Sequence, residues 1–128
     1  MIKTGAQLVQ EIKPDITEVS VVVLAANLAK DIVLIDVREP EEFEQNRIAG
    51  AVNLPRGVLE MKIQMHPQFK DAESPLEELN KHEIYLICRS GARSALAANS
   101  LQKMGFEHVK SVAGGMMAWQ EQGLHTES

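Results

Sequence analysis

Residues 84–94 read Ile-Tyr-Leu-Ile-Cys-Arg-Ser-Gly-Ala-Arg-Ser, a short apolar run followed at once by a polar loop. Four consecutive apolar residues at 84–87 are typical of a strand buried on both faces of a parallel sheet. From about Arg93 to Met104 the apolar residues Ala97, Leu101 and Met104 recur at i, i+4 and i+7, which predicts a helix. This unit predicts that a buried strand delivers Cys88 to a loop that ends in a helix.

The same alternation of strand and helix extends to both sides of this unit. Further strands are predicted at 16–19, 33–37, 51–54 and 109–112, and further helices at 4–13, 21–30, from Pro40 through Phe43 and from Gly114–Gly115 through Trp119. Residues 56–79 predict only short helical pieces around Pro67 and Pro75. The pattern predicts an α/β fold with a small, mostly parallel central sheet flanked by helices on both faces. A length of 128 residues fits one domain spanning residues 1–128.

Composition narrows the functional classes. The chain is 45% hydrophobic and 24% charged with a net charge of −5, and it has no basic stripe for nucleic acid. No apolar run is long enough for a membrane span and no signal peptide is evident, so we expect a cytoplasmic protein without a membrane partner. One cysteine allows no intrachain disulfide, and no Cys/His spacing indicates a metal site. Whatever Cys88 forms with a substrate must therefore be discharged by a second molecule.

The loop after the buried strand is the candidate site. A tight turn into a helix can point several backbone N–H groups inward, and Gly91 permits the backbone angles that such a cradle needs. The helix N-terminus and the charges of Arg89 and Arg93 would also favour thiolate over thiol and hold an incoming anion. A lone cysteine at a strand end is more often an inert core residue. The two arginines and the glycine within five residues of Cys88 favour the nucleophile.

Four blocks of the sequence together resemble the rhodanese family. The segment Cys88-Arg-Ser-Gly-Ala-Arg93 resembles the six-residue active loop, and Val33-Leu-Ile-Asp-Val-Arg-Glu39 looks like the family strand that ends in an acid and an arginine. The segments 43–54 and 112–119 resemble the first and the C-terminal signatures. The blocks follow the family order within about residues 16–124.

The resemblance implies a sulfurtransferase that needs no metal or organic cofactor. A Cys88 thiolate would take a sulfane sulfur from thiosulfate or a persulfide donor and become a persulfide. A thiol, cyanide or protein acceptor would then remove that sulfur. The resemblance implies that the backbone of the loop residues stabilises the persulfide; the loop and the start of its helix comprise Arg89, Ser90, Gly91, Ala92, Arg93 and Ser94.

Three residues outside the loop are predicted to support the site. Asp36 lies within an apolar strand and needs a partner, for which Arg38, Arg47 or loop N–H groups are candidates. Arg38 and Arg56 are expected to be exposed charges, and both are also candidates for the pocket mouth. Arg47 stands where the first rhodanese signature usually carries a histidine, so we expect the neighbouring polar contacts to differ and the reaction class to be unchanged.

Other residues are assigned from their surroundings in the sequence. Met116 and Met117 are better candidates for a pocket rim than Met61 and Met65, because they follow Gly114–Gly115. Trp119 is predicted to anchor the last helix in the core. The histidines are scattered and are all expected at the surface: His66, His82, His108 and His125.

Two alternatives remain open at this point. A cysteine phosphatase or arsenate reductase uses a similar cradle, but with five residues between Cys and Arg where this chain has four between Cys88 and Arg93. That smaller loop suits a sulfur atom better than a phosphoryl group, whose oxygens demand several donors. The second alternative is a sulfur-relay module that carries a persulfide for a partner protein.

Overall fold

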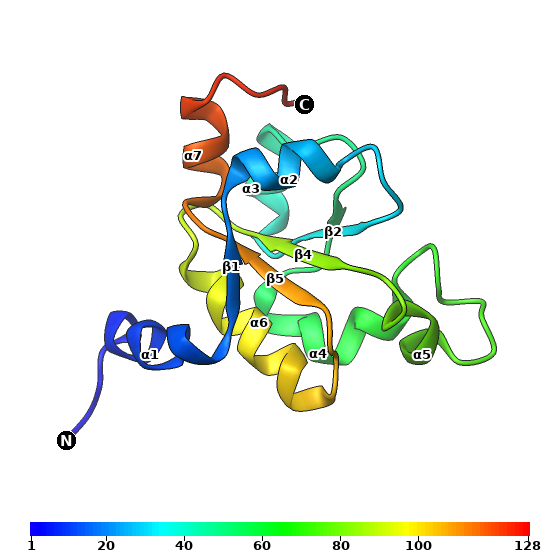
Figure 1. The fold of residues 1–128 in the computed structure, drawn as a ribbon, viewed down its shortest axis with the longest axis horizontal. Helices are drawn as coiled ribbons and strands as arrows, with labels where there is room; N and C mark the ends of the chain where they lie inside the picture. Colours follow the sequence, from blue (N-terminus) through cyan, green and yellow to red (C-terminus); the bar gives the residue numbers. More distant parts are fainter.

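One sheet of five strands runs through the middle of the molecule in the computed structural model, which describes residues 1–128 (Figure 1). All neighbouring strands are parallel, and their spatial order is β1-β5-β4-β2-β3. The predicted parallel α/β sheet is thus confirmed, with β4 in its centre. The strands are β1 (Thr17–Val19), β2 (Val33–Asp36), β3 (Val52–Asn53), β4 (Ile84–Ile87) and β5 (Val109–Val112).

Helices cover both faces of this sheet. In Figure 1, α2, α3 and α7 lie on one side, whereas α1, α4, α5 and α6 lie on the other. Short 3-10 turns at Lys13–Asp15, Arg56–Val58 and Ile63–Met65 connect some of them. The helices are α1 (Gly5–Ile12), α2 (Val21–Asn27), α3 (Pro40–Gln45), α4 (Leu59–Lys62), α5 (Pro75–Leu79), α6 (Ala92–Met104) and α7 (Gly115–Glu121).

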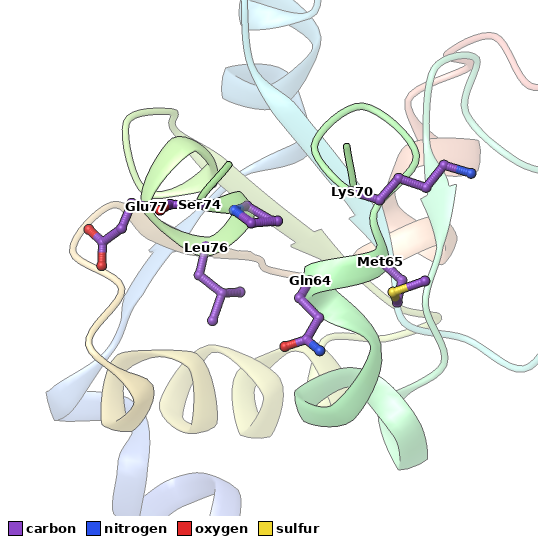
Figure 2. Close-up of a pocket in the computed structure, with 7 residues that line it drawn as sticks. Gln64, Met65, Lys70, Ser74, Leu76 and Glu77 are labelled. Carbon is purple, nitrogen blue, oxygen red and sulfur yellow. The ribbon is translucent and has the colours of Figure 1, made fainter. Parts of the chain in front are cut away.

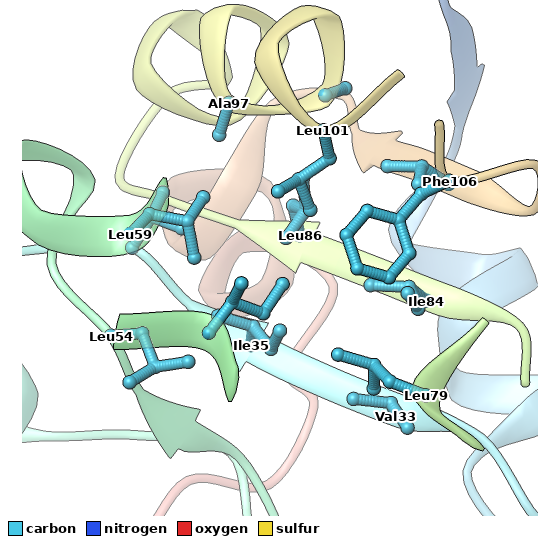
Figure 3. Close-up of a cluster of buried hydrophobic side chains, with 14 of the residues drawn as sticks. Val33, Ile35, Leu54, Leu59, Leu79, Ile84, Leu86, Ala97, Leu101 and Phe106 are labelled. Atoms are coloured by element: carbon cyan, nitrogen blue, oxygen red, sulfur yellow. The ribbon is translucent and has the colours of Figure 1, made fainter. Parts of the chain in front are cut away.

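The two faces of the sheet form two apolar cores, because successive strand residues point to opposite sides. Val33 and Ile35 of β2 pack on the α4 and α6 side, whereas Leu34 packs on the α2 and α7 side. Figure 3 shows the larger core, where Leu101 of α6 lies over Leu86 of β4. The predicted anchor Trp119 is buried in the smaller core. Because Cys88 belongs to the larger core, its side chain leaves the sheet on the α6 side.

Local sequence signals set several helix ends. The Thr4 hydroxyl accepts a hydrogen bond from Gln7 N at 3.1 Å, and the Ser20 hydroxyl accepts one from Val23 N at 3.2 Å. Gly105 ends α6 with a φ of 111°, as predicted. The predicted end of α2 at Lys30 is wrong, because the helix stops at Asn27.

The segment between β3 and β4 departs most from expectation. His66 was expected at the surface but is 3% exposed; its ring packs on Phe69 with 5.2 Å between centroids. Gln68 N donates to His66 Nδ1 at 3.2 Å, and burial lowers the pKa of this imidazole. The turns of this segment carry Ile63 and Phe69 into the larger core, and His66 is buried with them. No helix of the chain combines the length and the apolar character needed to cross a bilayer.

Candidate active site

The loop after β4 closes around the sulfur of Cys88. Gly91 N lies 3.1 Å from Sγ and Ser94 N lies 3.4 Å from it, and both N–H groups donate to the sulfur. Gly91 has a φ of 107°, a conformation that other residues rarely adopt. The side chain of Cys88 is only 1% exposed. Backbone donors aimed at one buried sulfur are an arrangement that favours an anion at that place.

The start of α7 is hydrogen-bonded to the backbone of this loop. Met116 N and Met117 N donate to the carbonyl oxygens of Cys88 and Arg89, at 2.8 Å and 3.0 Å. The backbones approach so closely at Gly115 that an added Cβ would lie 2.3 Å from the carbonyl oxygen of Cys88. Gly115 also has a φ of 53°. A glycine is therefore required where the last helix meets the loop.

Arg93 has a partner that the sequence did not indicate. Its guanidinium forms two hydrogen bonds with the Glu42 carboxylate, at 2.6 Å and 3.1 Å, and so joins α6 to α3. Chiefly because of this pairing, the pKa of Glu42 falls to about 2 and the pKa of Arg93 rises. Glu42 thus partly balances the charge of Arg93, which also interacts electrostatically with Cys88.

Arg89 is the free cation of the loop. Its exposed side chain forms no hydrogen bond or ion pair within the chain, and it lies on the wall of a cavity of about 420 Å³. Met116 and the half-exposed Met117 line the same cavity, which fits their predicted place at a pocket rim. By contrast Met61 and Met65 are exposed on and beside α4. The remaining lining residues are polar: Arg38, Glu42, Gln45, Asn46 and Gln120.

A larger cavity of about 460 Å³ lies elsewhere. Figure 2 shows that its walls come from α5 and from the turn at Ile63–Met65. None of its lining residues belongs to the Cys88 loop. No group of three or more His, Cys, Asp or Glu side chains is arranged to hold a metal ion.

The predicted supporting residues lie in two places. Asp36 is fully buried and accepts hydrogen bonds from Arg38 Nη2 at 2.8 Å and from Arg38 N at 3.0 Å. Arg38 was expected to be exposed, but it is 4% exposed because its guanidinium also donates to the carbonyl oxygen of Asn46 at 2.7 Å. Arg47 is not the partner of Asp36. It lies over the Phe43 ring and pairs with Glu127 at 3.6 Å, which ties the C-terminal segment to α3.

Two residues of the site could not be identified from sequence motifs. Glu42 is one of several acids in α3, and nothing in the sequence marks it as the partner of an arginine 51 residues away. Ser111 is fully buried in β5, and its Oγ lies 2.8 Å from Ser94 Oγ. The signal for Ser111 was a small hydroxyl residue within an otherwise apolar end of a strand.

Comparison with known proteins agrees with this geometry. Residues 20–122 match the rhodanese-like domain family. The chain belongs to this family. A chloroplastic thiosulfate sulfurtransferase of Arabidopsis thaliana is 36% identical over 118 residues, with 82% of this chain and 92% of that protein covered. A Bacillus subtilis protein named as a candidate sulfur carrier is 34% identical over 121 residues; the match covers 92% of this chain but only 58% of that protein.

Solved structures of related proteins share the whole fold. A Rhodopseudomonas palustris protein, described as of unknown function and a possible tyrosine phosphatase, superposes with a TM-score of 0.81 at 30% identity. The superposition covers 99% of this rhodanese-like chain and 96% of the other. A rhodanese-related protein from Thermoplasma volcanium has a TM-score of 0.71 at 26% identity, over 87% of this chain and 97% of that one.

Proposed function

We propose that this chain is a sulfurtransferase that carries sulfur on Cys88. The observation that supports it most is the closed loop, in which two backbone N–H groups surround the sulfur of the only cysteine. The sulfurtransferase names among its relatives support the same class. The loop residues Arg89 to Ser94 form the cradle, and Asp36 with Arg38 supports its neighbourhood.

The reaction would proceed in two displacements at sulfur. The Cys88 thiolate attacks the sulfane sulfur of a donor such as thiosulfate, the donor S–S bond breaks, and sulfite leaves with the electron pair. The product is a Cys88 persulfide. A thiolate or cyanide then attacks the outer sulfur, and the electron pair of the broken S–S bond returns to Cys88 Sγ. No redox partner is required, because each step exchanges one bond to sulfur for another.

The cavity beside the loop is the proposed docking place of the donor. Arg89 supplies a cation that attracts an anion to a protein whose net charge is −5. A space of about 420 Å³ is the size of a small-molecule site and exceeds what thiosulfate alone would fill. Organic persulfides with an anionic group are therefore candidate donors alongside thiosulfate.

A turnover assay tests the proposed function. Wild-type protein is expected to release sulfite from thiosulfate in the presence of cyanide or a thiol. Cys88→Ser should abolish this turnover while the circular dichroism spectrum remains that of a folded protein. Substantial turnover by the folded Cys88→Ser protein would contradict the proposal. A sulfur-accepting protein offered in place of the small thiol would distinguish a relay module, which should turn over faster with the protein.

A phosphatase is the second candidate, because a structural relative is described as a possible tyrosine phosphatase. Such chemistry needs several donors around the phosphoryl oxygens. Here the arginine at the end of the loop, Arg93, is held by Glu42 and is not free to bind an oxyanion. We therefore expect no hydrolysis of para-nitrophenyl phosphate by the protein, and measurable hydrolysis that is lost in Cys88→Ser would favour the phosphatase.

A further inference from the structure

Two buried hydroxyl groups lie behind the sulfur of Cys88. Ser94 is in the first turn of α6, and Ser111 is in β5 opposite Leu86 of β4; both serines are fully buried. Their oxygens are 2.8 Å apart, and Ser94 Oγ is 3.5 Å from Cys88 Sγ. The Ser111 hydroxyl has no other partner among the hydrogen bonds of the chain. The side chains of Ser111, Ser94 and Cys88 thus form a hydrogen-bonded chain that leads from β5 to the sulfur.

The direction of these hydrogen bonds follows from counting protons. The Ser94 hydroxyl has one proton and two lone pairs. It lies 3.2 Å from the carbonyl oxygen of Gly91, which can only accept, and a thiolate sulfur can also only accept. Whichever of the two receives the proton of Ser94, the remaining hydrogen bond to Ser111 must be donated by Ser111. The Ser111 hydroxyl is therefore a donor to Ser94 in either case.

The Ser94 proton is free to follow the charge on the sulfur. When Cys88 is a thiol, its S–H donates to Ser94 Oγ, and Ser94 donates to the Gly91 carbonyl. When Cys88 is a thiolate, the Ser94 proton can turn to the sulfur without movement of a heavy atom. The Gly91 carbonyl is not left unpaired, because it also accepts the N–H of Ala95 at 3.1 Å.

We propose that Ser111 is a positioning residue for sulfur transfer, whose hydroxyl fixes the Ser94 hydroxyl as a donor to the charged sulfur of Cys88. Its catalytic consequence rests on the proposed function. Sγ is an anion before the first displacement and again after the second, when the S–S electron pair returns to it. The Ser111–Ser94 chain stabilises Sγ at both points, and successive hydroxyls in such a chain strengthen one another.

Removal of the Ser111 hydroxyl tests this role. In Ser111→Ala we expect kcat to fall about 3- to 10-fold, the size of one lost hydrogen bond, with the KM for thiosulfate little changed. The KM is spared because neither serine lines the donor cavity. The pH midpoint of Cys88 alkylation by iodoacetamide should rise by about 0.5 to 1 unit for the same loss. A purely structural role would not move this midpoint.

Variants of matched size separate the effect of the hydroxyl donor from the effect of side-chain shape. Ser111→Thr and Ser111→Val have nearly the same size, but only the threonine keeps a donor. Ser111→Thr is expected to have an alkylation midpoint close to that of the wild type. Ser111→Val is expected to have a midpoint like that of Ser111→Ala. Val109→Ala in the same strand removes buried carbon without touching either serine, so it should lower stability and leave the midpoint unchanged.

A double-mutant cycle tests whether Ser111 acts through Ser94. The double variant Ser94→Ala/Ser111→Ala should have the same alkylation midpoint as Ser94→Ala alone. Additive shifts, or equal midpoints for the threonine and valine variants, would overturn the proposal. Alkylation needs no sulfur donor, so these arms still decide the role of Ser111 if the wild-type protein proves to have no sulfurtransferase activity.

Discussion

At the scale of single residues, the two arginines of the loop have different environments despite being four positions apart. Arg93 is bound by Glu42 and joins two helices, whereas the Arg89 side chain is exposed, unpaired and on the wall of the 420 Å³ cavity. The cation available to an anionic donor is therefore that of Arg89. Substitution of Arg89, unlike substitution of Arg93, should therefore affect anionic donors more than neutral ones.

We expect Arg89→Ala to lower kcat/KM for thiosulfate about tenfold, the lower end of what a charged hydrogen bond contributes, because Arg89 is exposed. Turnover with a neutral organic persulfide should change much less. Steady-state kinetics with both donors measures the difference, and Arg47→Ala is a control because Arg47 contacts Phe43 and Glu127 and does not line the cavity. An equal loss for both donors would assign Arg89 to the shape of the loop.

At the scale of elements, the Glu42–Arg93 pair holds α3 against α6, and its contribution to the stability of the fold depends on pH. The pKa of Glu42 falls from 4.5 to about 2 in the folded protein. A lowered carboxyl pKa adds stability that is full above 4.5 and is lost as the pH falls toward 2. Glu42→Gln should lower the free energy of unfolding by about 1 kcal/mol at neutral pH, since the pair is about a third exposed.

Urea unfolding at several pH values checks this prediction. The difference in free energy of unfolding between wild type and Glu42→Gln should shrink as the pH falls below 4.5. Glu44→Gln in the same helix serves as the control, because Glu44 has no ion pair in the structure. A difference that stays constant down to the lowest pH would mean that the ion pair with Arg93 is not its source.

The junction of α7 with the loop gives a second prediction for an element. In Gly115→Ala the new Cβ would meet the carbonyl oxygens of Cys88 and Arg89 at 2.3 Å and 2.6 Å, and the backbone would be strained at a φ of 53°. We expect a loss of at least about 2 kcal/mol in the free energy of unfolding. Gly57→Ala, with open space around it, should change stability little. Similar stability for both variants would contradict the close approach.

At the scale of the whole molecule, features that depend on neighbouring residues could be predicted from the sequence, whereas contacts between distant residues could not. The buried strands β2 and β4, the αL end at Gly105 and the place of Cys88 follow from apolar runs and glycines within a few residues. The pairing of Glu42 with Arg93 and of Ser94 with Ser111 joins residues 51 and 17 positions apart, so only the packed fold brings them together. The same reason explains the unexpected burial of His66.

His66 makes the stability of the molecule sensitive to mild acid. Burial lowers the pKa of His66 below 6.5, so as the pH falls below 6.5 the unfolded chain binds a proton before the folded one does. The melting temperature should therefore fall between about pH 7.5 and about pH 5.5, and less so in His66→Gln. The exposed His108→Gln is the control. An unchanged pH dependence in His66→Gln would assign it to other groups.

The central claim is that Cys88 carries sulfur, and intact-mass spectrometry tests it most directly. Wild-type protein is incubated with thiosulfate or a persulfide donor, freed of the donor, and measured before and after addition of cyanide. We expect a mass increase of one sulfur atom that cyanide removes and that Cys88→Ser never acquires. An unchanged mass with every donor, or an added sulfur that persists in Cys88→Ser, would contradict it.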